Sequence, residues 1–453
     1  MSINSAIDKY LGDNLDESIQ ELTDYCAQPS VAAQQLGIRE CAEMTRALLQ
    51  KRGFTTQIFQ TPGSPIVFAE RKGRSDKTLL FYNHYDVQPA EPLELWESPP
   101  FKPEIRDGRL FARGVIDDKG HLTSRLFAID AILASEGELP CTIKIIVEGE
   151  EEVSSTNLEH FVSTQADLLA ADACIWEYGG VDFNDRPVQH LGLRGISYVE
   201  LRVKTANQDV HSGLGGSIFP NAAWRLVWAL QSLKGPDEHI RIDGFYDDVK
   251  PVPERSRELM SMLPDPSEEY KQRYNLKGFI KGLTGGIELR IEEVFTPTCT
   301  ICGLTSGYQG EGSKTVLPAE ARAKIDFRLV PDQNPGKIIP LLRAHLDRHG
   351  FDDIEIIDLG SEAPAVTDPD DPFVKLVVAE ALDVYGQSMQ IVPLGGGSGP
   401  SAIFIKTLNI PIVSAGVGHP GAQAHAPNEN MRIDLYLKGA RHIARILTTF
   451  GGE

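Results

Sequence analysis

The sequence predicts an α/β domain that is interrupted by a smaller α+β domain. Strand-like and helix-like segments alternate from the N-terminus to about Leu191, period-two strands follow, and the α/β pattern returns after Pro364. Alternating strands and helices favour a sheet with parallel members. Strict period-two strands are typical of an antiparallel sheet with one solvated face. A chain of 453 residues also exceeds the size of one compact core, which favours two domains.

The first part of the chain supplies most of the expected parallel sheet. Its first clear helix has apolar residues at helical spacing and a stop signal at Gly53. The apolar strands end in polar residues, as buried strands do where they leave the core. In chain order the segments predict helix 38–54, strands 65–72 and 77–87, helix 121–137, strand 141–148, helix 157–170 and strand 172–179.

The middle of the chain predicts a separate α+β domain of the split βαβ type. "GISYVELRVKTA" (195–206) alternates apolar and polar residues, and two further strands of this kind follow later. The expected order is strand 195–206, helix 221–233, a polar and proline-rich stretch 235–266, strand 321–331, helix 336–350 and strand 354–359. Helix 372–386, strand 410–418 and helix 433–450 then return to the α/β pattern. We therefore expect one domain from 1–191 and 363–453, and an inserted domain from 192–362.

The charge of the chain argues against anionic partners. The 44 basic and 64 acidic residues give a net charge of -20, which repels phosphate backbones and anionic membranes. We therefore expect no nucleic acid partner and no membrane partner. The same charge suits a protein that gathers cations.

The N-terminus and the cysteines predict a cytoplasmic protein. The first residues form an acidic amphipathic pattern without the basic and apolar regions of a signal peptide. No apolar run approaches the ~20 residues needed to span a bilayer. The six cysteines are scattered, as reduced thiols are in cytosolic proteins. Cys299 and Cys302 form a C-x-x-C in a strand-like stretch, and we expect both to serve packing.

Polar clusters follow several predicted strands of the α/β domain, at the sheet edge where ligands bind in open α/β folds. They occur in "FYNHYDVQP", "ARGVIDDKG", "VEGEEEVSS", "CIWEYGG" and "GHPGAQAHAPNEN". In chain order the candidate residues are His84 and Asp86, Asp117, Glu150 to Glu152, Glu177, and His419 with His425. Each cluster alone has an ordinary structural explanation, such as a helix N-cap or a solvated loop. Their convergence at one edge makes a functional site the better interpretation.

So many carboxylates at one sheet edge require a compensating positive charge. Converging carboxylates repel one another and resist burial unless cations neutralise them. Histidine with oxygen ligands suits zinc first, with manganese or cobalt as alternatives. Two such ions ~3.5–4 Å apart can share an activated water and hold a developing oxyanion. The sequence therefore predicts two divalent metal ions and a hydrolytic reaction.

These motifs resemble the dinuclear zinc exopeptidases and deacylases. The family includes carnosinase and cytosolic non-specific dipeptidase, carboxypeptidase G, and acetylornithine deacetylase with succinyl-diaminopimelate desuccinylase. "HYDVQP", "RGVIDDKG", "EGEEE" and "AHAPNE" occur in the family's order and spacing over essentially the whole chain. The resemblance implies a catalytic domain built as a three-layer αβα sandwich, and an inserted ferredoxin-like domain that serves as a lid and in dimerisation.

The resemblance also implies a set of metal ligands. His84 and Glu177 would bind one ion, Glu152 and His425 the other, and Asp117 would bridge both, with a cis peptide bond after Asp117. These are the expected ligands: His84, Asp117, Glu152, Glu177 and His425. His419 remains an alternative to His425 as the last ligand.

Two further residues of the expected catalytic domain, Asp86 and Glu151, have predicted roles beside the ligands. Asp86 would orient His84, since metal-binding histidines usually donate their other ring proton to a carboxylate. Glu151 would be the general base, taking a proton from the bridging water and returning it to the leaving amine. We expect Glu150 to be a solvated loop residue.

The inserted domain would contribute to substrate binding. "DVHSGLGGSIFPN" resembles the lid segment whose histidine reaches the partner subunit's active site, so His211 is a candidate for oxyanion stabilisation. Thr315 and Arg328 correspond to substrate-holding residues, and the arginine fork suits a terminal carboxylate. Gly396, Gly397 and Ser398 lie in "PLGGGSGPSA", a loop whose backbone N–H groups can bind an anion. Ordinary alternatives are a surface ion pair for Arg328 and a plain turn for the glycines.

The sequence thus predicts a cytoplasmic homodimeric enzyme that hydrolyses amide bonds of short peptides, foremost a dipeptidase. The alternative within enzymes is an N-acyl-amino-acid deacylase or carboxypeptidase using the same site. Glu177 favours that alternative, because the carnosinase-like branch usually has aspartate there, whereas "HYDVQP" and the long lid favour the dipeptidase. A non-catalytic metal-binding member of the family is a third hypothesis, against which stands the complete set of ligands and base.

Overall fold

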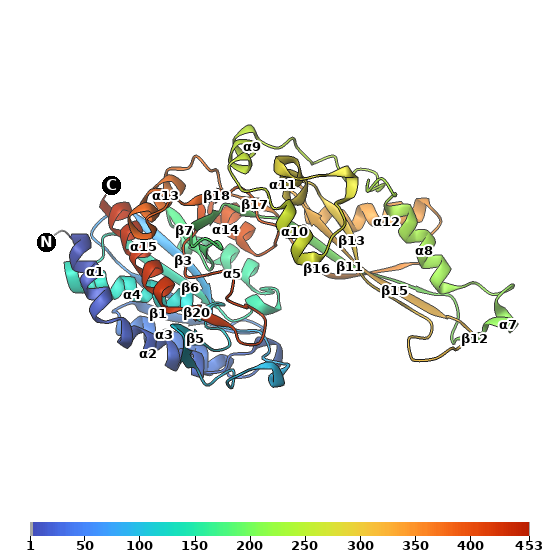
Figure 1. Cartoon of the computed structure of the whole chain (residues 1–453). Coiled ribbons are helices and arrows are strands. Elements are labelled where there is room, and N and C mark those ends of the chain that lie inside the picture. The colour runs from blue at the N-terminus through green and yellow to red at the C-terminus, as the bar shows by residue number, and fades with distance from the viewer. Residues whose placement is uncertain (1–2, 453) are drawn as a thin grey trace. The chain divides into compact units, whose positions relative to one another are not determined.

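The computed structural model describes residues 3–452, which divide into two compact units (Figure 1). Unit 1 comprises the chain up to Leu191, Thr367–Val392 and the chain from Ile403 onward. Unit 2 comprises Gly192–Val366 and Pro393–Ala402. The short segment 393–402 was expected in the first domain, yet it groups with unit 2. The backbone of this segment is hydrogen-bonded to unit 2, since Gly395 N donates to the Gly192 carbonyl at 2.8 Å.

Unit 1 contains a six-stranded sheet in the order β1-β2-β6-β3-β7-β19. The strands are β1 (Thr55–Phe59), β2 (Ile66–Arg71), β3 (Thr78–His84), β6 (Thr142–Glu148), β7 (Ala173–Trp176) and β19 (Ile412–Ser414). Strands β6, β3, β7 and β19 run parallel to one another, whereas β1 and β2 form an antiparallel edge in which β2 pairs with β6. Every residue of β6 is buried, including Lys144 and Glu148, as its mostly apolar sequence predicts for a strand inside the sheet.

Helices cover both faces of this sheet. Alternate strand residues such as Phe81 and Ile145 join one core with helices α1 (Ile3–Asp13), α2 (Leu15–Ala27), α3 (Ile38–Lys51), α4 (Lys119–Glu136), α13 (Pro372–Tyr385) and α15 (Ile433–Gly452). Their neighbours Tyr82 and Ile146 join a second core with α5 (Leu158–Thr164), α6 (Ala166–Leu169) and α14 (Ser401–Leu408). Side chains alternate across a strand, so the sheet serves two cores at once. Unit 1 is therefore the three-layer αβα sandwich that the sequence predicted.

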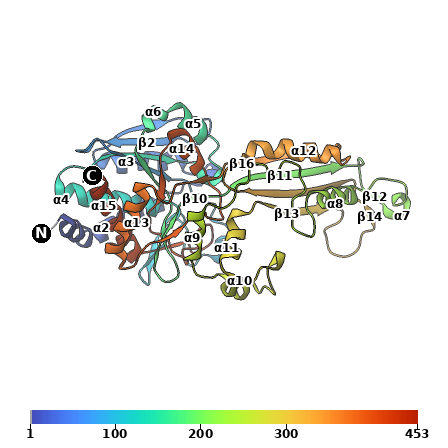
Figure 2. The same cartoon turned by 90° about the horizontal axis from the view of Figure 1, so that it is seen from above.

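Unit 2 contains a four-stranded antiparallel sheet in the order β13-β15-β11-β16. The strands are β11 (Gly195–Lys204), β13 (Thr298–Ser306), β15 (Glu320–Leu329) and β16 (Glu355–Glu362), and β11 and β15 run side by side in both views (Figures 1 and 2). Helices α8 (Ala222–Leu233) and α12 (Ile338–Arg348) share a core with alternate residues of the sheet. The chain order βαββαβ with this strand order is the ferredoxin-like fold that was expected.

The proline-rich segment of unit 2 is more ordered than its composition suggested. It forms α9 (Glu254–Ser261), and α10 (Ser267–Tyr274) and α11 (Gly286–Phe295) follow before the sheet resumes. In β13, Cys299 is buried but Cys302 is exposed. The packing expectation therefore holds for Cys299 and is wrong for Cys302, because β13 is an edge strand with an irregular register between Ile301 and Gly303.

Short elements complete the two units. The small strands are β4 (Glu104–Arg106), β5 (Arg109–Phe111) and β20 (Asn430–Arg432); β8 (Gly180–Val181), β9 (Pro187–His190) and β18 (Gln390–Val392); β10 (Gly192–Leu193) with β17 (Ala365–Val366); and β12 (Val210–His211) with β14 (Val316–Leu317). The remaining helices are α7 (Ser212–Gly215) and the 3₁₀ turns η1 (Ala32–Gln34), η2 (Leu93–Leu95), η3 (Glu151–Val153), η4 (Ile280–Gly282) and η5 (Pro335–Lys337). Within residues 3–452, no helix has both the length and the apolar character needed to cross a membrane.

Candidate metal centre

The candidate site lies where three parallel strands of unit 1 end. His84 is the last residue of β3 and pairs in register with Glu148, the last residue of β6, while Glu177 directly follows β7. The turn η3 follows β6 and carries Glu151 and Glu152. The parallel arrangement thus brings side chains that are far apart in the sequence to one edge of the sheet.

His84 is held by hydrogen bonds on both of its ring nitrogens. Nδ1 lies 3.0 Å from the backbone oxygen of Asp86 and 3.5 Å from its carboxylate. Nε2 lies 3.0 Å from Asp117 Oδ1. Burial lowers the pKa of His84, but the hydrogen bonds to Asp117 and Asp86 outweigh it and raise the pKa well above the usual value. The bond at Nδ1 leaves Nε2 as the nitrogen that faces the carboxylates.

The buried carboxylate of Asp86 also shapes the glutamate turn. Its two oxygens accept hydrogen bonds from the backbone N–H groups of Glu151, at 3.2 Å, and Glu152, at 3.1 Å. The side chain of Gln88 donates to Glu152 Oε2 at 2.7 Å. Asp86 therefore fixes the start of η3 as well as lying beside His84. The nearer acceptor for the histidine is the Asp86 carbonyl, a detail that the sequence did not reveal.

Asp117 lies between the two histidines. His425 Nε2 is 2.9 Å from Asp117 Oδ2 and 3.1 Å from Glu152 Oε2, while His84 Nε2 approaches the other oxygen of Asp117. Burial raises the pKa of Asp117, yet hydrogen bonds from His425 and His84 prevail and hold it well below its usual range. The same contacts raise the pKa of His425 to about 10. Asp117, Glu152 and His425 bring their ligand atoms within 4.8 Å of one another.

Two carboxylate oxygens of the expected metal ligands have no hydrogen-bond partner within residues 3–452. They are Glu152 Oε1 and Glu177 Oε2, and both are buried. The other oxygen of Glu177 accepts from Trp176 Nε1 at 3.1 Å. Burial, with repulsion from Glu151, raises the pKa of Glu177 well above its usual value. Unpartnered buried carboxylates next to imidazoles are the donor set that zinc, manganese or cobalt takes, so the residues fit divalent ions.

The three consecutive glutamates have different surroundings. Burial raises the pKa of Glu151 to about 7, with opposing effects from His84 and Glu152. A carboxyl with a pKa near 7 suits proton transfer at neutral pH. The expectation that Glu150 is a solvated loop residue is wrong. It is buried, and it accepts hydrogen bonds from Ser64 N at 2.9 Å and Asn157 Nδ2 at 2.7 Å.

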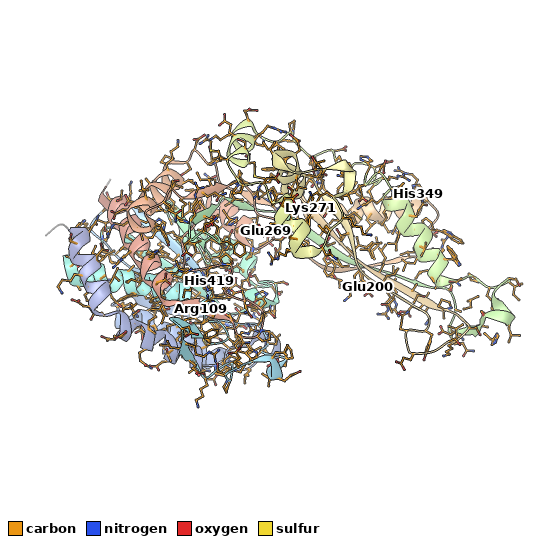
Figure 3. The ribbon with its side chains drawn as sticks, viewed as in Figure 1. Arg109, Glu200, Glu269, Lys271, His349 and His419 are labelled. Atoms are coloured by element: carbon orange, nitrogen blue, oxygen red, sulfur yellow. The ribbon has the colours of Figure 1, made fainter. Side chains whose placement is uncertain are left out.

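His419 lies outside this group. Its Nδ1 accepts from the backbone N–H of Gly421 at 3.1 Å. Figure 3 shows His419 beside Arg109, and burial together with the charges of Arg109 and Arg432 lowers its pKa. The geometry therefore favours His425 over His419 as the histidine of the cluster.

Several supporting residues were not predicted. Asp118, joined to Asp117 by the expected cis peptide bond, accepts from Asn83 Nδ2 at 2.5 Å and from His84 N at 3.2 Å. The buried Arg125 donates to the backbone oxygens of Tyr82 at 2.9 Å and Glu177 at 3.1 Å, which ties β3 to β7 beneath the site. Both residues lie in or near the quoted motifs, but no sequence pattern distinguishes a ligand from the residue that supports it.

The expected substrate residues of unit 2 form two groups. Arg328 Nη1 donates to Ser398 Oγ at 2.8 Å, and the backbone oxygen of Gly397 accepts from Arg194 N at 2.9 Å. Arg328 also lies 3.4 Å from Asp326, an ion pair of the kind expected as the ordinary alternative. In the second group, exposed His211 lies on β12, which pairs with β14, and the Thr315 oxygen accepts from Ser212 N at 3.0 Å.

Comparison with known proteins adds independent findings. Residues 80–449 match the sequence model of peptidase family M20/M25/M40. A Cys-Gly metallodipeptidase of Saccharomyces cerevisiae is 30% identical over 398 residues, covering 84% of this chain and 82% of that protein. The human β-Ala-His dipeptidase is 28% identical over 399 residues, covering 84% and 77%. Among solved structures, an M20 family metallo-carboxypeptidase from Sulfolobus solfataricus superposes with a TM-score of 0.91 at 37% identity, covering 96% of this chain and 100% of that one.

Proposed function

Because the chain belongs to peptidase family M20/M25/M40, we propose that it is a two-metal dipeptidase. The predicted family and fold class are confirmed, as is the prediction of a metal-dependent peptidase. One observation above all supports the specific site. Asp117 lies between His84 and His425, each within 3.0 Å of a different carboxylate oxygen, as a residue that bridges two cations requires.

We propose the following ligands for the two ions. His84 and Glu177 bind one, Glu152 and His425 bind the other, and Asp117 contacts both. Zinc suits this mixed histidine and carboxylate set best, with manganese or cobalt as alternatives. When bound, such ions lower the pKa of a water and polarise the carbonyl of the scissile bond.

Glu151 is the proposed general base. Its backbone N–H is bonded to Asp86, while its side chain has a pKa raised to about 7 by burial. A carboxylate placed beside a ligand can take a proton from the attacking water and donate it to the leaving amine. Water attacks directly in this scheme, so the reaction has no covalent enzyme intermediate.

Unit 2 supplies the proposed substrate contacts. Arg328 and Ser398 form one polar group in which the guanidinium can bind a terminal carboxylate through two parallel hydrogen bonds. The backbone of the loop around Gly397 offers further donors. His211 is proposed to stabilise the tetrahedral oxyanion, and Thr315 is proposed to help hold the substrate together with Arg328.

A carboxypeptidase is the second candidate function. It is favoured by Glu177 and by the similarity to the Sulfolobus metallo-carboxypeptidase. That protein is 37% identical to this chain, more than the two dipeptidases described above. The two activities differ in substrate length, since a dipeptidase requires both a free amine and a free carboxylate close to the scissile bond. An N-acyl-amino-acid deacylase would use the same site on a third class of amide.

A substrate panel tests these alternatives. Protein loaded with zinc, manganese or cobalt is offered dipeptides, the same sequences extended by one and two residues at the N-terminus, and N-acetyl or N-succinyl amino acids. We expect cleavage of the dipeptides and loss of activity after treatment with a chelator. Release of C-terminal residues from the longer peptides at equal rates would establish the carboxypeptidase instead, and cleavage of the acyl compounds alone would establish the deacylase.

We also propose a homodimer in a reducing compartment. Trp224 and Trp228 on α8 are 57% and 54% exposed and stack on each other, with ring centroids 5.9 Å apart. The edge strand β13 exposes Ile301 and Leu304. Apolar surface of this kind marks a protein interface, and an open strand edge invites pairing with a second chain. All six cysteines are free, which supports a cytoplasmic location.

A further inference from the structure

A buried glutamate connects the segments that carry Asp117 and His425. Glu429 is 0% exposed, and its carboxylate accepts four hydrogen bonds. Oε2 accepts from Arg113 Nη1 at 2.7 Å and Gly114 N at 2.9 Å. Oε1 accepts from Ile116 N at 2.9 Å and Asp117 N at 3.1 Å. All four donors belong to the loop that ends at Asp117.

The backbone on either side of Glu429 strengthens this connection. The Glu429 carbonyl accepts from Ala112 N at 3.1 Å, and the next residue, Asn430, pairs with Phe111 in the β20–β5 ladder. His425 lies four residues before Glu429 in the same segment. The two segments therefore share a ladder, and the carboxylate extends it to the residue that bears the Asp117 side chain.

The chemistry of this contact requires a carboxylate. Arg113 is 1% exposed, so the two opposite charges are buried together, and the four hydrogen bonds to the Glu429 carboxylate offset the cost of burying it. Glutamine has the same shape, but it replaces one acceptor oxygen by an NH₂ group. That group would face N–H donors from the loop and leave them without an acceptor.

We propose that Glu429 is a positioning residue for the metal centre, which sets the distance between Asp117 and His425. The inference rests on the two-metal function proposed above. His84 and Glu177 are fixed by a different structure, namely the ends of β3 and β7 joined by Arg125. Asp117 contacts both proposed ions, but only the ion shared with Glu152 and His425 would have two of its ligands on the connected segments. Loss of Glu429 should therefore weaken that ion more than the ion that His84 and Glu177 share with Asp117.

Zinc binding by the purified chain tests this inference. Titration against a competing chelator gives the stoichiometry and the two affinities for the original protein, Glu429→Gln and Glu21→Gln. Glu21 is a matched control, because this residue of α2 pairs with the buried Arg52, which directly follows α3, and neither residue belongs to the site. We expect Glu429→Gln to retain one tight ion and to bind the second about 10–100-fold more weakly. Glu21→Gln should bind both ions as the original protein does.

Zinc-soaked crystals of Glu429→Gln identify the retained ion, and anomalous scattering should place it beside His84 and Glu177. Unchanged affinities, or an equal loss at both sites, would overturn the inference while the two-metal function stands. An original protein that binds fewer than two ions would overturn both. If Glu429→Gln does not fold, Arg113→Lys serves in its place, since it keeps the charge but loses the fixed geometry of the guanidinium. The same unequal loss is expected, and equal affinities would again contradict the inference.

Discussion

The three glutamates after β6 show how neighbouring residues of one type acquire different chemistry. Glu150 points to Ser64 and Asn157 and fixes the turn. Glu152 faces His425, while the Glu151 backbone is bonded to Asp86 and its buried carboxyl has a pKa of about 7. A tight turn directs successive side chains apart. Three consecutive glutamates can therefore have three different environments.

Glu151→Gln should keep both metal ions and lose about 10²–10⁴-fold in kcat, because the amide cannot accept the proton of the attacking water. Metal analysis and dipeptide turnover measured on the same sample check this. Glu150→Gln is the matched control one residue away. It should retain most activity and lower the melting temperature, because one of its two hydrogen-bond acceptors is replaced. Equal activity losses in both variants would contradict the assignment of Glu151 as base.

The sequence predicted the residues whose ligand atoms converge, but not the hydrogen bonds that hold those residues in place. Motif order and spacing pointed to Asp117, Glu152 and His425, whose ligand atoms converge in the structure. Glu429 and Gln88 lie inside the same motifs, yet their contacts depend on segments more than 60 positions away. Hydrogen bonds of this range are set by the tertiary fold, so local pattern cannot reveal them.

The packing of helices α13 and α15 buries a titratable group that is not among the proposed metal ligands. His442, on α15, is fully enclosed, and its Nε2 donates to the Val377 carbonyl on α13 at 2.9 Å. Burial lowers the pKa of His442 to about 4, against a weaker opposing effect of that hydrogen bond. The imidazole is therefore neutral in the folded protein at neutral pH.

This burial makes the stability of unit 1 depend on pH. Between about pH 6.5 and pH 4, His442 binds a proton in the unfolded state but not in the folded state. The contribution is complete above pH 6.5 and is lost as the pH falls toward 4, with a total on the order of 3 kcal/mol. His442→Gln should flatten the fall in unfolding free energy over this window, measured by urea unfolding.

The control for His442 is His160→Gln, whose side chain is exposed on α5. This variant should keep the pH dependence of the original protein. A His442→Gln profile that falls as steeply as the original between pH 6.5 and pH 4 would contradict the explanation.

Most helices and strands follow from their sequence periodicity, and the exceptions have physical causes. Helix α4 was predicted although most of its residues are buried, and its length is what separates a buried helix from a buried strand. Strand β1 was not predicted, since its residues are mostly half-exposed on the sheet edge and carry little apolar signal. The segment 393–402 groups with unit 2 and not with the expected first domain, because its partners in unit 2 are set by long-range backbone hydrogen bonds.

The chain as a whole places its exposed apolar residues unevenly. In unit 2, pairs of large apolar side chains lie exposed on α8 and on the edge strand β13. The end of α8 and the start of β13 line a common cavity of about 390 Å³, so the two elements adjoin there. An interface built on them would join the sheets of two copies at their open edges.

Trp228→Glu should convert the proposed dimer into a monomer, because it places a charge on the exposed apolar surface of α8. Light scattering over a range of concentrations measures the change. Phe183→Glu is the control, since Phe183 is an aromatic residue of unit 1 that is even more exposed than Trp228, and its replacement should leave the mass unchanged. A monomeric original protein with full activity would exclude both the dimer and any action of His211 on a partner subunit.

The exposure of Cys302 gives experimenters a selective chemical handle. The pKa values of Cys26, Cys141, Cys174 and Cys299 are raised to about 12 by burial, and Cys41 is buried as well. A maleimide dye should therefore attach to the Cys302 sulfur on β13. Its fluorescence can then follow formation of the proposed dimer in real time without altering any residue of the candidate metal centre.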